Sequence, residues 1–143
     1  MTIRELMTGG LITVRRETSV QEARELMTKE RIRHLPVTDA RGDLVGIVTD
    51  RDIRLNVPSP ATSLSVQEIG HLFSKLTVGE IMTHSVITVG PDRPAREAGQ
   101  LMLDHTIGAL PVLADGQLVG IITETDIVRA FVDTTAAASP SRP

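Results

Sequence analysis

The chain has 143 residues, a formal charge of −3, and 41% hydrophobic and 23% charged residues, an ordinary balance for a globular protein. It contains no cysteine, which excludes disulfides, thiolate zinc sites and cysteine nucleophiles. Its only aromatic residues are two Phe, so the core must be built from Leu, Ile, Val, Met and Ala. No block of Lys and Arg is present, which argues against nucleic acid as a partner.

No segment approaches the roughly 20 consecutive apolar residues that cross a bilayer. The N-terminus also lacks the basic stretch and apolar run of a signal peptide. We therefore expect a cytoplasmic protein that has no membrane partner.

The sequence contains an internal repeat. Residues 7–38 and 82–113 are identical at 13 of 32 positions, and residues 42–53 and 116–127 at 8 of 12. Composition alone would give roughly 6–7% identity. The chain therefore arose by duplication of one unit.

The duplication divides the chain into a first repeat over 1–57, a connector over 58–77, a second repeat over 78–133 and a tail over 134–143. The tail consists mostly of Ala, Ser and Pro, and we expect it to be disordered. Neither repeat has enough apolar surface to offset its own ordering entropy, so we expect the two repeats to form one module.

Each repeat is predicted to begin with a short strand rich in β-branched residues, over 12–14 and 87–89, followed by an amphipathic helix. Thr18 is the predicted N-cap of the first helix, with Gln21 completing a capping box, and Pro94 suits the first turn of the second. The predicted core positions are Val20, Ala23, Leu26 and Met27 in the first helix and Ala95, Ala98, Leu101 and Met102 in the second.

Two more strands and a final helix complete each repeat. The strands are 35–37 and 44–49 in the first repeat and 110–112 and 118–123 in the second, and the final helices start near Asp50 and Glu124. The later strand of each pair is almost wholly apolar, as is typical of a strand buried on both faces. We therefore predict a mixed α/β (α+β) fold, in which two β-α-β-β-α repeats pack sheet to sheet about a pseudo-twofold axis.

The connector begins with a proline-broken loop over 58–64. Ser65 and Glu68 then form a predicted capping box that opens a short helix. This helix shows an apolar side formed by Val66, Ile69, Leu72, Phe73 and Leu76. We expect it to pack on the module.

The order LMT…TV…LPV…LVGIVT-D-R-D-I, present twice with small changes, resembles the cystathionine β-synthase (CBS) domain, and the pair resembles a Bateman module. The resemblance covers residues 3 to about 132 and extends to stand-alone bacterial CBS-pair proteins. Because the sequence ends soon after the second copy, we expect no further domain. The resemblance implies a regulatory module and not an enzyme. The implied ligands contain adenosine, such as AMP, ADP, ATP, NAD or S-adenosylmethionine, and no cofactor is required. A homodimer and an unidentified regulated protein are the other implied partners.

The resemblance implies two ligand clefts, each combining the Gly-x-x-Thr-x-x-Asp end of one repeat with the first strand and LPV strand of the other. Cleft one is expected to hold Ile12, Thr13, Ile32, Arg33, His34 and Pro36 with Thr123, Thr125 and Asp126. Cleft two is expected to hold Ile87, Thr88, Ile107, Gly108, Ala109 and Pro111 with Thr49, Arg51 and Asp52.

The Thr-x-x-Asp pattern has two physical interpretations. An aspartate one turn into a helix can accept hydrogen bonds from two adjacent ribose hydroxyls. The same pattern is also a helix cap. The whole family pattern favours ligand binding, and the alternative for the chain is an interaction scaffold whose clefts have lost their ligands.

Arg33 and His34 make cleft one the more polar and the better candidate for a charged nucleotide, although both could equally be solvated surface residues. Arg51 could contact a phosphate in cleft two or could instead pair with Asp50 or Asp39 at the surface. Gly108 and Ala109 leave room in this cleft for a larger or more apolar group. No histidine has a carboxylate spacing that indicates a metal site, and no catalytic arrangement stands out. The recurring methionines Met7, Met27, Met82 and Met102 are predicted core residues.

Overall fold

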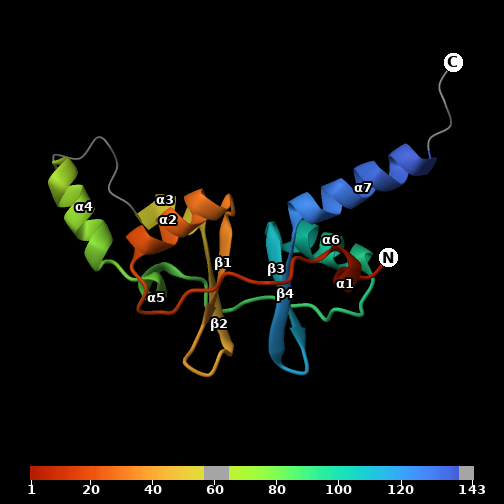
Figure 1. Cartoon of the computed structure of the whole chain (residues 1–143), viewed down its shortest axis with the longest axis horizontal. Helices are drawn as coiled ribbons and strands as arrows, with labels where there is room; N and C mark the ends of the chain where they lie inside the picture. The colour runs from red at the N-terminus through yellow and green to blue at the C-terminus, as the bar shows by residue number, and fades with distance from the viewer. Residues whose placement is uncertain (57–64, 139–143) are drawn as a thin grey trace, which may run out of the picture. The chain divides into compact units, whose positions relative to one another are not determined.

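The computed structural model describes residues 1–56 and 65–138, which divide into two compact units (Figure 1). One unit spans Ile12–Val86, and the other joins Met1–Leu11 to Ile87–Pro143. Each unit contains one two-stranded antiparallel sheet surrounded by helices. The predicted mixed fold is therefore confirmed, while the sheet-to-sheet packing of the repeats and their pseudo-twofold axis stay predictions.

The two sheets are hairpins of equivalent residues. Strands β1 (His34–Thr38) and β2 (Leu44–Thr49) lie in the first unit, which we call the β1–β2 unit. Strands β3 (Ala109–Ala114) and β4 (Gln117–Thr123) lie in the second, the β3–β4 unit. Leu and Val of each LPV strand are fully buried, and the apolar strand beside them is buried at its centre. The predicted hairpins are thus confirmed.

The predicted first strands are much reduced. Val14 makes a single parallel bridge to Val37, with its N–H donating to the Pro36 carbonyl at 3.1 Å. Val89 makes the equivalent bridge to Val112. The predictions over 12–14 and 87–89 are therefore wrong as regular strands, because only one residue of each segment bonds to the hairpin.

Helices α2 (Val20–Glu30) and α6 (Ala95–His105) pack the predicted apolar stripe against the two cores. The predicted cap of α2 is wrong by one residue. Ser19 is the N-cap and accepts the Glu22 N–H at 3.1 Å, whereas the Thr18 hydroxyl accepts the Arg15 N–H at 3.0 Å. Thr18 thus closes the turn before the helix, and this leaves Ser19 to cap the first helical N–H groups.

The N-terminal segment of each repeat packs on the hairpin of the other repeat. Helix α1 (Ile3–Leu6) buries Ile3 completely in the core of the β3–β4 unit, and Thr8 bonds to Ile121 of β4. Helix α5 (Val78–Ile81) buries Val78 in the β1–β2 unit, where the following residues reach β2. The structural units therefore do not coincide with the sequence repeats.

The final helices differ in length. Helix α3 covers Asp50–Asn56, and α7 covers Glu124–Ala138. The prediction of disorder is thus wrong for 134–138, where the alanine-rich sequence favours helix. Residues 139–143 lie outside the described residues.

The connector helix α4 (Val66–Lys75) is capped by Ser65, which accepts the Glu68 N–H at 3.1 Å. Ile69 and Leu76 pack against the β1–β2 core, and α4 contacts α2, as predicted. Val66 is 86% exposed, so the predicted apolar side is only partly covered. The predicted loop over 58–64 lies outside the described residues.

Candidate ligand-binding sites

A reciprocal cap joins the end of β2 to the start of α3. The backbone N–H of Thr49 donates to Asp52 Oδ2 at 2.9 Å, and the N–H of Asp52 donates to Thr49 Oγ1 at 3.1 Å. Both residues are half-buried. The two bonds hold the carboxylate over the first turn of the helix.

The β3–β4 unit repeats this cap between β4 and α7. Asp126 Oδ2 accepts from the Thr123 N–H at 2.8 Å and from Thr123 Oγ1 at 3.0 Å, while the Asp126 N–H donates to Thr123 Oγ1 at 3.3 Å. The capping interpretation of Thr-x-x-Asp therefore holds in both units. In each carboxylate only Oδ2 is bonded among the described residues, and Oδ1 remains as an acceptor for another molecule.

The residues just before the LPV strand lie against this cap. The Asp50 N–H donates to the Arg33 carbonyl at 3.0 Å, and His34 is the register partner of Thr49. In the other unit the Glu124 N–H donates to the Gly108 carbonyl at 2.9 Å, and Ala109 is the register partner of Thr123. Antiparallel pairing thus brings the start of one strand to the cap at the end of its neighbour.

Each hairpin end brings together residues that the sequence assigned to different clefts. In the β1–β2 unit Arg33 and His34 of cleft one lie beside Thr49 and Asp52 of cleft two. The grouping of residues across the repeats stays a prediction. Sequence reasoning missed that one hairpin gathers both sets, although the antiparallel register of LPV with LVGIVT could have indicated it.

The remaining predicted site residues are apolar or exposed. Pro36, Pro111 and Ala109 are buried within the strands. Partly buried residues packed against the cores are Ile12, Ile32, Ile87 and Ile107, and Thr88 is also half-buried. Thr13 and Thr125 are exposed. The isoleucines provide apolar surface of the kind that an adenine ring requires.

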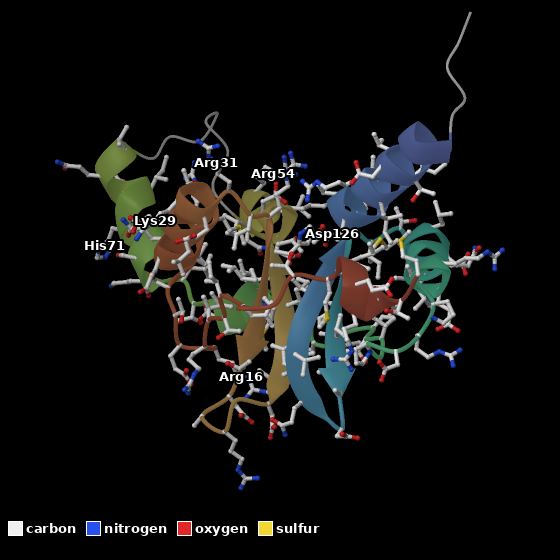
Figure 2. The ribbon with its side chains drawn as sticks, turned by 45° about the vertical axis from the view of Figure 1, so that its right-hand side comes forward. Arg16, Lys29, Arg31, Arg54, His71 and Asp126 are labelled. Atoms are coloured by element: carbon white, nitrogen blue, oxygen red, sulfur yellow. The ribbon has the colours of Figure 1, made fainter. Side chains whose placement is uncertain are left out.

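The two hairpin ends differ in charge. Figure 2 labels Arg54 of α3 in the first unit and Asp126 of α7 in the second. Arg33 and Arg51 are exposed in the β1–β2 unit, and neither forms an ion pair or side-chain hydrogen bond within the described residues. The corresponding residues of the β3–β4 unit are Gly108 and Thr125. Arg54 of α3 instead approaches Asp50 at 4.0 Å.

The part of the chain that the structure describes holds no group of three or more His, Asp or Glu placed to bind a metal ion. Within the same residues, no helix is both long enough and apolar enough to cross a membrane.

Residues 3–59 and 78–133 match the model of the CBS domain family. The chain belongs to the CBS domain family. A CBS domain-containing protein of Dictyostelium discoideum is 32% identical over 131 residues, which cover 91% of this chain and 90% of that protein. L-aspartate semialdehyde sulfurtransferase of Methanocaldococcus jannaschii is 35% identical over 130 residues, but this CBS chain spans only 23% of that enzyme's length.

Solved structures of CBS proteins are similar over nearly the whole chain. AcuB of Vibrio cholerae, a protein assigned to acetoin utilization, has a TM-score of 0.78 at 32% identity, covering 100% of this chain and 98% of that chain. The CBS domain pair of protein MJ0100, in complex with 5′-methylthioadenosine and S-adenosyl-L-methionine, also has 0.78 at 32%, covering 94% and 98%. CBSX2, in complex with AMP, has 0.75 at 34%, covering 94% and 98%.

Proposed function

We propose that this CBS chain is a regulatory module that binds an adenosine-containing ligand at the hairpin end of each unit. The family and the bound AMP, methylthioadenosine and S-adenosylmethionine of two similar structures support this ligand class. The module carries out no catalysis of its own. Its effect passes through the helices that follow each site to a partner protein.

The observation that carries the proposal is the half-satisfied carboxylate of Asp52 and of Asp126. Oδ2 of each is fixed by the cap, which leaves Oδ1 to accept from a ribose hydroxyl. A carboxylate held in this way binds without losing further side-chain freedom. The neighbouring isoleucines, Ile12 and Ile32 in one unit and Ile87 and Ile107 in the other, supply an apolar surface for the base.

Calorimetric titration with AMP, adenosine and 5′-methylthioadenosine tests the proposal. Asp52→Ala should weaken binding at one site, Asp126→Ala at the other, and the double variant at both. Each loss should be about 10- to 100-fold in affinity, as expected for a charged hydrogen bond worth about 1.5–3 kcal/mol.

Asp52→Asn separates ligand binding from capping. The amide oxygen can still accept the Thr49 N–H, so the fold should be kept, but the anionic acceptor is lost. Asp39→Asn is a matched control, because Asp39 is a carboxylate at the turn end of the same hairpin. Unchanged affinity in folded Asp52→Asn and Asp126→Asn variants would reject the proposed sites, and no binding by the wild type would favour the scaffold function.

A further inference from the structure

We propose that α7 of one copy of this chain docks in the groove between α2 and α4 of a second copy. The contact is made twice in a dimer, because each copy provides one helix and one groove. It uses none of the ligand-site residues and does not depend on the proposed function. It joins two faces that the duplication of the repeat does not explain, one on the connector helix and one on the last helix of the chain.

The groove lies where the connector helix α4 packs beside α2 (Figure 1), and its volume is about 550 Å³. Helix α4 contributes Val66, which is 86% exposed, and Ile69, while Gly70 leaves open space beside them. Helix α2 contributes a charged edge that includes Glu25 and Lys29. The groove therefore offers apolar surface and, next to it, charged side chains to another molecule.

Helix α7 carries an apolar face that its own unit does not cover. Val128, Phe131 and Val132 are each more than half exposed, whereas Ile127 is the residue of this helix that packs against the β3–β4 core. Pro58 stands at the sequence position equivalent to Val132, so this face is not a product of the duplication. A contiguous exposed apolar face of this kind marks an interaction site.

The charges beside the two faces are complementary. Glu25 and Lys29 are one turn apart on α2, about 6 Å along the helix axis. Arg129 and Asp133 have the same spacing on α7, where they adjoin the apolar face. None of the four forms an ion pair among the described residues. When α7 of the second copy runs in the same direction as α2, Arg129 lies opposite Glu25 and Asp133 lies opposite Lys29.

The apolar contact supplies the affinity, and the charges set the direction of the docked helix. Exposed ion pairs add little to affinity, but like charges placed opposite each other exclude the wrong register. Aromatic anchors in apolar grooves usually dominate the binding energy of an interface. Phe131 is therefore the anchor of this contact, and Val66 is its counterpart in the groove.

Sedimentation equilibrium of the full chain measures the dissociation constant of the dimer. Phe131→Asp should raise it by about 100-fold or more, because the anchor is lost from both contacts. Val66→Asp should do the same from the groove side, and an aspartate in the first turn is compatible with helix α4. Leu103→Asp is the matched control, since Leu103 of α6 is 77% exposed and belongs to neither face. Circular dichroism checks that each variant is folded.

Two further measurements identify which faces meet. An equimolar mixture of the Phe131→Asp and Val66→Asp chains should recover dimers, because the unchanged α7 of one chain meets the unchanged groove of the other. Lys29→Glu and Asp133→Lys should each raise the dissociation constant by about 10-fold. Their combination in one chain should return it to within about 3-fold of the wild-type value.

Three outcomes would overturn the inference. A wild-type chain that sediments only as a monomer has no such contact. A Val66→Asp chain that still dimerises, while Phe131→Asp does not, would show that α7 meets a face other than the groove. A further loss of affinity on combining the two charge variants would contradict the pairing of Lys29 with Asp133. None of these results bears on the ligand titrations, because no substitution lies at Asp52 or Asp126.

Discussion

The β1–β2 and β3–β4 units have equivalent cores of their own and differ at the hairpin ends that carry the Thr-x-x-Asp caps. Both bury an LPV strand, accept a Met-Thr segment from the other repeat and cap the final helix with Thr-x-x-Asp. They differ at the residues before the LPV strand, at the second residue of the final helix and in the hairpin turn. The duplicated sequence thus retains what packing requires and varies where a ligand would be distinguished.

Both repeats have a glycine at the same place in the LVGI strand, Gly46 in the first and Gly120 in the second. The N-terminal segment that each hairpin receives from the other repeat explains this glycine. A Cβ atom at Gly46 would lie 2.7 Å from Met82 Sδ and 2.9 Å from the Thr83 carbonyl oxygen. At Gly120 it would lie 2.5 Å from Met7 Sδ and 3.1 Å from the Thr8 oxygen. The glycine of each LVGI strand is therefore required by a close neighbour from the other repeat, and not by a special backbone angle.

Deletion of residues 1–8 should produce the largest difference in stability between the two units. It removes Ile3 and Met7 from the β3–β4 core, and loss of one large buried side chain costs about 2–5 kcal/mol. Amide hydrogen exchange should show lost protection in β3 and β4 with much less change in β1 and β2. Loss confined to β1 and β2 would show that the segment belongs to its own repeat and would contradict the exchange.

Gly46→Ala should lower the free energy of unfolding by about 1–3 kcal/mol, the usual range for overpacking. Gly120→Ala should cost less. A flexible methionine side chain is the closest obstacle at both positions, but the nearest backbone oxygen would lie 3.1 Å from a Cβ at Gly120 and 2.9 Å from one at Gly46. Urea unfolding measures both values. Gly70→Ala in α4 is the control, since its Cβ would meet no atom within 4 Å and alanine favours helix.

Ser19→Ala tests a smaller difference, because α2 has a side-chain cap whereas Pro94 at the start of α6 provides none. The loss of the bond from the Glu22 N–H should cost about 1 kcal/mol in thermal or urea unfolding. Gln21→Ala should have almost no effect. A larger loss of stability in Gln21→Ala than in Ser19→Ala would support the cap by Thr18 and Gln21 that the sequence predicted.

The smallest predicted effect lies in the hairpin turns. The backbone N–H of Asp43 donates to Asp39 and lowers the pKa of this carboxyl below its ordinary value of 3.8. A lowered folded-state pKa means that the bond stabilises the fold above pH 3.8 and that this contribution is lost as pH falls through the folded pKa. Asp39→Asn should reduce the acid dependence of stability below about pH 4. An NMR titration that places the pKa of Asp39 above 3.8 would contradict this.

The sequence predicted the hairpins, the apolar stripes of α2 and α6 and the Thr-x-x-Asp ends, because each follows from local periodicity or from the repeat. The exchange of α1 and α5 could not be predicted in this way, since both repeats carry the same motif and either hairpin would accept either copy. The gathering of Arg33 with Asp52 was missed for a different reason. Both residues flank one hairpin of the first repeat, and the antiparallel register of LPV with LVGIVT could have indicated that they lie close together.

A crystal structure of the chain with AMP bound tests the central claim most directly, which is that each site is built from one unit. We predict the ribose hydroxyls on Asp52 Oδ1 and the phosphate beside Arg33 and Arg51. A ribose bound by Asp126 with its phosphate at Arg33 would instead support the cleft predicted from the sequence and contradict this account.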